Sequence, residues 1–336
     1  MHDRPSRRDL LARGGATLAA AAALPAIPLL EETVNAQQPG TPGANPAASN
    51  APARPASEPF GYCLNTSTIR GHNLSITEEI DTAAEAGYRA IEPWIGKIDA
   101  YVDQGGSLKD LAKRLSDHGM TVESSIGFAQ WIVNDDDRRS KWMEVAKRDM
   151  DRIAQIGGKR TAAAAAGAQD RTDIDLMRAA ERYRALLELG DKMGVVPQVE
   201  VWGFSKTLTK LSHAVMVAVE AGHPKACVLS DVYHLHKGGS DFNGLRLLSA
   251  DSMHVMHMND YPADPPREKI TDAQRIYPGD GVAPLDSILR TLRDIGFRGY
   301  LSLELFNESY WKNDNALTVA ETGLRKMREA VKKAMA

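Results

Sequence analysis

The chain has 336 residues, of which 43% are hydrophobic and 25% charged, and its formal net charge is −3. The near-neutral charge balance argues against a nucleic-acid-binding protein, which would need a basic face, and the hydrophobic fraction argues against a disordered chain. The two cysteines, Cys63 and Cys227, exclude a small disulfide-rich domain and a zinc site made of several thiolates.

The N-terminal residues are typical of an export signal. Three arginines precede an Ala- and Leu-rich run from Leu10 to Leu30, which is too interrupted for a membrane-spanning helix of about 20 apolar residues. Ser6-Arg7-Arg8-Asp9-Leu10-Leu11 resembles the twin-arginine signal, and Val34-Asn35-Ala36 offers a cleavage site. We therefore expect residues 1–36 to be a signal peptide that the twin-arginine export machinery carries to the periplasm. An N-terminal membrane anchor is the alternative.

Residues 37–59 include six prolines, the last of them Pro59, among small side chains that offer little to bury. Such a segment cannot offset the entropy that is lost on ordering. We therefore expect residues 37–59 to form a disordered Pro/Ala-rich linker and residues 60–336 to form the folded domain.

From residue 60 onward one pattern recurs, namely an amphipathic helix, a glycine at its end and a short apolar strand. The pattern predicts that the glycines close the helices in the left-handed conformation. Short, nearly unbroken apolar strands between helices indicate a parallel sheet that is covered on both faces. The glycines are Gly87, Gly119, Gly157, Gly194, Gly222 and Gly296.

The first strand, FGYCLN, and a later one, MHVMHMND, bring the number of expected strands to eight. Eight βα units in about 275 residues predict an α/β fold of the closed (β/α)8 type, a TIM barrel. The alternative is an open doubly wound sheet, which would prefer a glycine-rich phosphate loop after its first strand. This chain has Asn65-Thr66-Ser67-Thr68 at that point.

Ionisable side chains stand at the ends of the last four expected strands. They are Glu200 in PQVEVW, Asp231 in VLSDVYH, His257 in VMHMND and Glu304 in LSLELF. Such groups are costly to bury unless a cation or a partner compensates them, although each one alone could simply cap the next helix. Three carboxylates and one imidazole predict one divalent metal site that favours Mn²⁺, Mg²⁺ or Co²⁺.

The same residues form a longer pattern: Glu200, Asp231-Val-Tyr-His234, His257-Met-Asn-Asp260, Pro278-Gly-Asp-Gly281 and Glu304-Leu-Phe306. This pattern resembles the xylose isomerase-like sugar isomerase/epimerase superfamily, which includes ketose 3-epimerases, hydroxypyruvate isomerases, inosose dehydratases and endonuclease IV. The resemblance covers roughly residues 60–330. It implies that Glu200, Asp231, His257 and Glu304 hold one metal ion and that Glu200 and Glu304 are also the catalytic acid/base groups.

The resemblance also implies residues that contact the substrate. His234 of the D-x-x-H motif is one, and the arginine that precedes the P-G-x-G turn is expected to be Arg275, with Arg267 as the alternative. Relatives often have Asn and His after the first glutamate, whereas this chain has Val-Trp-Gly, so we expect Trp202 to form an aromatic wall. Trp94 either stacks on the sugar or packs in its loop.

These residues predict a metal-dependent isomerase or epimerase of carbohydrate metabolism. It would move a proton next to a carbonyl group of a neutral keto-sugar, through an enediolate, with Glu200 and Glu304 as the proton-transferring pair. The alternatives are a lyase or dehydratase acting on a keto-sugar or keto-inositol, and an exported carbohydrate-binding barrel without activity. The second and third strands end in Glu-Pro-Trp and Ser-Ser-Ile-Gly rather than in the histidines of endonuclease IV. The expected partner is therefore a small sugar and not nucleic acid.

Overall fold

The computed structural model of the protein describes residues 58–336. The expected signal peptide, residues 1–36, and residues 37–57 of the expected linker lie outside the described residues. No helix in the described part of the chain has both the length and the apolar character that a membrane span requires.

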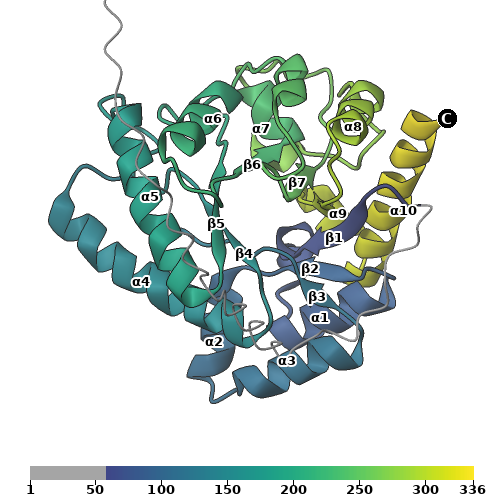
Figure 1. Ribbon diagram of the computed structural model, residues 1–336. Helices are drawn as coiled ribbons and strands as arrows, with labels where there is room; N and C mark the ends of the chain where they lie inside the picture. Colours follow the sequence, from purple (N-terminus) through teal and green to yellow (C-terminus); the bar gives the residue numbers. More distant parts are fainter. Residues whose placement is uncertain (1–57) are drawn as a thin grey trace, which may run out of the picture. The chain divides into compact units, whose positions relative to one another are not determined.

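Eight parallel strands curl into a barrel at the centre of the domain (Figure 1). Their order in the sheet is β3-β2-β1-β8-β7-β6-β5-β4, so the first strand pairs with the last. The predicted TIM barrel is confirmed, and β1 and β7 lie in the predicted segments FGYCLN and MHVMHMND. The strands are β1 Gly61–Asn65, β2 Ala90–Glu92, β3 Thr121–Val122, β4 Arg160–Ala163, β5 Val196–Glu200, β6 Val228–Asp231, β7 Val255–Met258 and β8 Tyr300–Leu303.

Hydrogen bonding continues between the two ends of this strand order. The backbone amide of Ala162 in β4 donates to the carbonyl of Ser125, three residues beyond β3, over 2.9 Å. An isolated parallel bridge joins Trp94 to Ile126 and prolongs the pairing of β2 with β3. The segment after β3 therefore closes the barrel.

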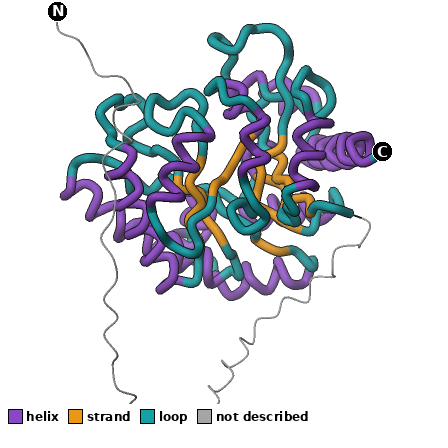
Figure 2. The backbone as a smooth tube through the Cα atoms, turned by 45° about the horizontal axis from the view of Figure 1, so that its top comes forward, coloured by secondary structure: helices purple, strands orange, loops and turns teal. Residues whose placement is uncertain are grey.

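Helices surround the strands, as Figures 1 and 2 both show. The α-helices are α1 Ile76–Glu85, α2 Ile95–Asp103, α3 Leu108–Asp117, α4 Asp136–Gln155, α5 Leu176–Met193, α6 Leu211–Glu220, α7 Val232–Lys237, α8 Leu285–Asp294, α9 Glu308–Asn313 and α10 Ala316–Met335. The described residues also form three 3-10 helices in loops: η1 Thr66–His72, η2 Phe242–Leu247 and η3 Asp272–Gln274. The six predicted glycines all have positive φ values, between 57° and 91°.

The strands are buried on both faces, which explains their unbroken apolar sequences. Every residue of β1, β6 and β7 is buried, and Phe60 just before β1 packs on Phe297 with ring centroids 5.7 Å apart. Cys63 and Cys227 are buried free thiols. A polar side chain at the end of such a strand has no route to solvent except at the carboxyl end of the barrel.

Candidate active site

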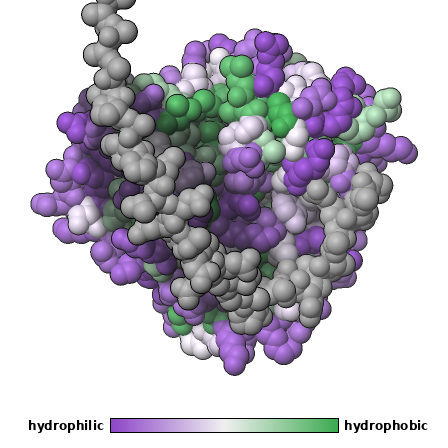
Figure 3. Space-filling view, viewed as in Figure 1, coloured by the Kyte–Doolittle hydropathy of each residue, from purple (hydrophilic) through white to green (hydrophobic). Residues whose placement is uncertain are grey.

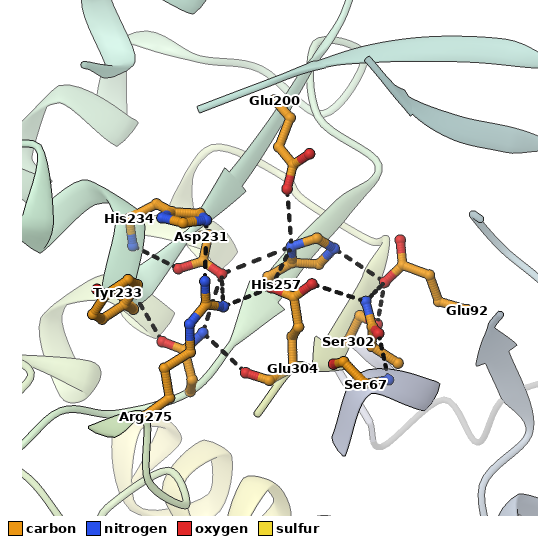
Figure 4. Close-up of polar contacts among 12 residues, drawn as sticks. Ser67, Glu92, Glu200, Asp231, Tyr233, His234, His257, Arg275, Ser302 and Glu304 are labelled. Carbon is orange, nitrogen blue, oxygen red and sulfur yellow. Dashed lines mark hydrogen bonds and ion pairs between the residues drawn. The ribbon is translucent and has the colours of Figure 1, made fainter. Parts of the chain in front are cut away.

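The four predicted metal ligands lie at the carboxyl ends of four adjacent strands (Figure 4). Glu200 ends β5, Asp231 ends β6, His257 is the third residue of β7, and Glu304 directly follows β8. The register pairs Asp231 with His257. All four side chains are buried, and their residues are at most 4% exposed.

The three carboxylates converge on Nδ1 of His257. An oxygen of Glu304 lies 3.2 Å from this nitrogen, one of Asp231 lies 3.7 Å away and one of Glu200 lies 3.8 Å away. Asp231, His257 and Glu304 each offer a ligand atom within 4.8 Å of the other two. Glu200 joins this group through its contact with His257. The structure thus brings together all four residues that the sequence analysis grouped.

Glu92, the last residue of β2, holds the other nitrogen of His257. Nε2 of His257 lies 3.0 Å from Oε2 of Glu92, and that oxygen also accepts hydrogen bonds from Ser302 and Asn65 at 2.6 and 3.0 Å. Nδ1 of His257 has no hydrogen-bond partner among the described residues. A metal-binding histidine usually donates its second ring N–H to a carboxylate, so the arrangement turns Nδ1 toward the acidic cluster.

The sequence analysis missed Glu92 as part of the site. The signal that could have identified it is its position, because it is an acidic residue at the end of an apolar strand like the four predicted ligands. Burial by itself would raise the pKa of Glu92, but the charge of His257 and its hydrogen bonds lower this pKa overall. Burial would likewise lower the pKa of His257, and the charges of Glu304 and Glu92 outweigh it, so that this pKa is raised.

Asp231 has two functions, because each of its oxygens has different partners. Oδ1 accepts the backbone N–H of His234 at 2.7 Å and caps the start of α7. Oδ2 faces the cluster and accepts a hydrogen bond from Nδ2 of Asn259 at 3.1 Å. Asp231 therefore does cap a helix, which is the ordinary alternative for such a residue, and its other oxygen still faces the site.

Arg275 is buried among the predicted ligands. Its Nη1 donates to Oδ2 of Asp231 at 2.9 Å and to Oε2 of Glu304 at 2.6 Å. Its Nη2 donates to Nε2 of His234 at 3.0 Å. Arg267, the alternative arginine, is exposed. The structure therefore places Arg275, and not Arg267, in the site.

His234 presents a free N–H group. Because arginine only donates, Nε2 of His234 must accept this hydrogen bond. The ring proton of His234 therefore lies on Nδ1. This Nδ1 is buried and has no hydrogen-bond partner in the described part of the chain. Burial, together with the charge of Arg275, lowers the pKa of His234 to about 4, so the ring is neutral. A neutral, buried donor without a partner suits a contact with a substrate oxygen.

The two predicted acid/base glutamates have opposite electrostatic surroundings. Burial raises the pKa of Glu200 to about 8, since the charge of His257 offsets it only in part and the neighbouring carboxylates add to it. Burial would also raise the pKa of Glu304, but the charges of His257 and Arg275 lower it overall. Two carboxyl groups with separated pKa values are the arrangement that acid/base pairs use.

The H-x-x-D and P-G-x-G motifs meet in one turn. The carboxylate of Asp260 accepts hydrogen bonds of 2.8 to 3.1 Å from four backbone amides, those of Tyr261, Gly279, Gly281 and Ala283. A Cβ atom on Gly281 would lie 2.4 Å from Oδ1 of Asp260 and 2.2 Å from the carbonyl oxygen of Tyr261, so no larger residue fits. These hydrogen bonds hold the turn that follows Arg275 against Asp260.

Trp94 and Trp202, the predicted aromatic contacts, lie in the loops after β2 and β5. Nε1 of Trp94 donates to Oδ1 of Asn65 at 3.2 Å, and Nδ2 of Asn65 donates to Oε1 of Glu304 at 3.2 Å. Trp202 stacks on Phe204 with ring centroids 5.2 Å apart. Trp94 is therefore tied to the acidic cluster through a single side chain.

A cavity of about 470 Å³ lies elsewhere, between α8, α10 and the turn at Gly279. Two of its lysines pair with acidic neighbours, Lys326 with Asp280 and Lys333 with Asp286. It contains none of the predicted ligands, so its size does not make it the candidate site.

The donor set at β5 to β8 fits a hard divalent cation. Three carboxylates and one imidazole are the ligand types that such ions accept, and buried carboxylates need a compensating positive charge. A cation at Nδ1 of His257 would also give this nitrogen the partner that it lacks among the described residues.

Comparisons with known proteins agree with this geometry. Residues 80–330 match the model of a protein family described as Xylose isomerase-like TIM barrel. An inosose isomerase of Bacillus velezensis is 25% identical over 264 residues, which are 77% of this chain and 92% of the relative. A 3-dehydroshikimate dehydratase of Pseudomonas putida is 22% identical over 237 residues, which are 70% of this chain and 37% of the relative. The crystal structure of the IOLI protein with a zinc atom is similar, with a TM-score of 0.76 and 22% identity, over 82% of this chain and 99% of that one.

Proposed function

Because the chain belongs to the xylose isomerase-like TIM barrel family, we propose that it is a metal-dependent sugar isomerase or epimerase. The observation that carries this proposal is the convergence of Glu200, Asp231 and Glu304 on Nδ1 of His257. The similarity to an inosose isomerase supports the proposal. Because this relative and the similar dehydratase are enzymes, an enzyme is favoured over a sugar-binding barrel without activity. The substrate class that we propose is a neutral keto-sugar.

Asp231, His257, Glu304 and Glu200 would hold the cation, with Glu92 fixing the ring of His257. A bound divalent cation stabilises the negative charge that develops on the carbonyl and neighbouring hydroxyl oxygens of a sugar during proton transfer. Mn²⁺, Mg²⁺ and Co²⁺ suit this donor set best. The zinc atom in the similar IOLI structure adds Zn²⁺ to the ions to be tested.

Glu200 and Glu304 would carry the proton. Glu200 would exchange a proton with the carbon beside the carbonyl group, and Glu304 would serve the opposite face. Arg275 keeps Glu304 ionised and in place through its 2.6 Å contact. Nδ1–H of His234 would donate to a substrate hydroxyl, and Trp94 and Trp202 would cover the apolar face of the ring.

The fate of the proton distinguishes the possible reactions. Return to the opposite face of the same carbon gives an epimer, and return to the adjacent carbon gives an isomer. Loss of a hydroxyl from the β-carbon gives a dehydrated product instead, and the similarity to a 3-dehydroshikimate dehydratase supports this second candidate function. All three start with the same removal of a proton.

The test is exchange of substrate hydrogen with solvent. A panel of neutral ketoses, keto-sugars and keto-glycosides is incubated with the protein in deuterated water, with and without a chelator, and incorporation at carbon is measured by mass spectrometry. We expect exchange that needs the metal and that falls at least about 100-fold in Glu200→Gln and in Glu304→Gln. A new ultraviolet-absorbing enone would identify the dehydratase.

Glu123→Gln is the matched control, because Glu123 is equally buried but pairs with Lys159 and Arg160 outside the cluster. It should retain metal-dependent exchange. Absence of metal-dependent exchange across the whole panel would refute the proposed function, and sugar binding without any exchange would favour the carbohydrate-binding alternative.

We also propose that the protein is exported through the twin-arginine machinery and acts in the periplasm. The support is the sequence around Arg7 and Arg8. Replacement of both by lysine should retain the full-length chain in the cytoplasm, and unchanged export of that variant would contradict the route.

A further inference from the structure

Five aromatic side chains in the loops around the candidate site form a feature that we call the aromatic rim: Trp94, Phe128, Trp202, Phe204 and Phe306. They follow β2, β3, β5 and β8. The ring of Trp94 lies 6.2 Å from Phe306 and 5.2 Å from Phe128. Phe128 lies 6.2 Å from Trp202, and Trp202 lies 5.2 Å from Phe204. Loops far apart in the sequence therefore place their rings in one continuous series.

Residues of the candidate active site close this series into a circle. Phe204 lies 5.6 Å from the ring of His234, which lies 5.3 Å from the ring of Tyr233. The guanidinium of Arg275 lies 4.5 Å from Tyr233 and 5.0 Å from Phe306. Since His234 and Arg275 contact the acidic cluster or each other, the circle borders the place where the sugar would bind (Figure 4).

Two members of the rim are unusually exposed for phenylalanine. Phe204 is 45% exposed and Phe128 is 37% exposed. Figure 3 shows hydrophobic side chains gathered over the region of α6 and α7, where α6 also carries the exposed Met216 and Val219, which lie outside the rim. Exposed apolar surface beside a polar site commonly marks a ligand-binding surface. The rim therefore offers apolar ring faces just beyond a site made for a polar sugar.

Arg70 in η1 adds a positive charge to the same rim. Its guanidinium lies 4.8 Å from the ring of Trp94 and 5.8 Å from that of Phe306. The side chain is exposed, and within residues 58–336 the structure shows these two ring contacts and no salt bridge for it. Nε1 of Trp311 donates to the carbonyl of Thr68 at 2.8 Å and holds η1 in place. A cation held above aromatic rings attracts the face of a further aromatic ring.

We propose that the aromatic rim binds an aromatic aglycone through its exposed rings, Phe128 and Phe204, so that the substrate is a keto-glycoside that carries an aryl group rather than a free ketose. This inference rests on the proposed function, which places the sugar at the acidic cluster. A second sugar ring would bring hydroxyl groups that need hydrogen-bond partners, and the exposed rings of Phe128 and Phe204 offer none. An aryl group offers flat faces to these rings and to Arg70.

The test measures binding separately from catalysis, with unoxidised glycosides. Isothermal titration calorimetry compares the 4-nitrophenyl and methyl β-glycosides of glucose, galactose and mannose with cellobiose, using the metal-loaded protein. We expect at least one 4-nitrophenyl glycoside to bind about tenfold or more tightly than its methyl counterpart and than cellobiose.

Rim variants show whether the aromatic character matters. The ratio of the two affinities should fall toward 1 in Phe204→Leu, which keeps apolar bulk, and should persist in Phe204→Trp, which keeps a ring. Arg70→Gln should reduce the ratio more than Arg70→Lys. Met177→Ala is the matched control, because Met177 is 46% exposed but lies in α5, and it should keep the wild-type ratio.

The remaining outcomes separate this inference from the proposed function. Equal affinity for the aryl and methyl glycosides, or no measurable binding of the aryl glycosides, would overturn it, and tighter binding of cellobiose would assign the rim to a second sugar. If free keto-sugars exchange deuterium but the aryl preference is absent, the proposed function stands and this inference fails. An aryl preference without any exchange would support the aromatic rim as a binding site and would refute the proposed function.

Discussion

Glu92 determines which nitrogen of His257 faces the carboxylates. It receives Nε2 at 3.0 Å, while Ser302 and Asn65 hold the same oxygen of Glu92 in place. A carboxylate in this position makes a ligand imidazole more basic and fixes its orientation. Glu92 is thus a positioning residue whose contribution is to metal affinity.

We predict that Glu92→Gln weakens metal binding by about 10- to 100-fold, because the neutral amide accepts a weaker hydrogen bond from His257. Chelator competition measures the dissociation constant. Glu123→Gln, at an equally buried glutamate outside the cluster, is the control and should leave metal affinity unchanged. The same dissociation constant in Glu92→Gln and wild type would show that Glu92 only packs beside the ring.

Glu79 in α1 carries a second prediction at the residue scale. It is 1% exposed and lies 3.5 Å from Nζ of Lys97 in α2. Burial raises the pKa of Glu79 from 4.5 to about 7, although the charge of Lys97 lowers it in part. Because the folded-state pKa lies above the unfolded one, the stabilisation that this shift provides is present in full below about pH 4.5 and is lost as the pH rises to about 7.

The pH dependence can be isolated by comparing wild type with Glu79→Gln in urea unfolding of the metal-free protein. Between pH 4 and pH 8 the free energy of unfolding should change in favour of the variant, by on the order of 3 kcal/mol. Subtraction removes the titration of all other groups. Parallel pH profiles for the two proteins would mean that Glu79 ionises as freely in the folded state as in the unfolded one.

At the scale of elements, the loop after β5 depends on close contact with α7. A Cβ atom on Gly203 would lie 2.2 Å from the carbonyl oxygen of His234 and 2.7 Å from the backbone nitrogen of Gly238. The contact sets the distance between the loop that carries Trp202 and Phe204 and the helix that carries His234. Because Gly203 has no side chain, the loop after β5 can lie directly against α7, and both belong to the proposed substrate site.

Gly203→Ala should consequently destabilise the protein by about 1–3 kcal/mol, because the methyl group forces the loop away from α7. Urea unfolding measures the free energy, and sugar binding should weaken with it. Gly96→Ala in α2 is the control, since nothing lies within 4 Å of the added Cβ, and it should be neutral or slightly stabilising. Equal stability of both variants would show that the loop moves aside without cost.

At the scale of the whole molecule, the candidate metal site joins β5, β6, β7 and β8, which make up half of the barrel. A ligand that binds only the folded state stabilises it by about 2.7 kcal/mol at 100 times its dissociation constant. For a barrel of this size that corresponds to a rise in Tm of roughly 5 °C.

Thermal unfolding with saturating Mn²⁺ and with excess chelator tests this expectation. The metal should raise the Tm of wild type, and Asp231→Asn, which lacks one ligand charge, should show a much smaller rise. An identical Tm with metal and with chelator would contradict a metal site that joins the four strands.

The amino-acid sequence by itself determined the strands, the closing glycines and the four ionisable residues at the ends of β5 to β8. Each of these features can be recognised within a few neighbouring residues. A helix end is marked by one glycine, and a candidate ligand is marked by an ionisable residue directly after an apolar strand. The position of Glu92 at the end of a strand was a local signal of the same kind, but its contact with His257 and the contacts of Asn65 and Arg70 were not predictable in this way. Glu92 and His257 are separated by 165 residues and meet only inside the barrel.

The tertiary structure decided between Arg275 and Arg267 and brought the rings of the aromatic rim into contact. Nothing in the sequence of one loop indicates which side chains of another loop it will touch, since the contact depends on loop length and on the order of the strands around the barrel. The chain thus encodes its barrel and its candidate metal ligands in local patterns, whereas the surroundings of a substrate arise only when the carboxyl ends of all eight strands meet.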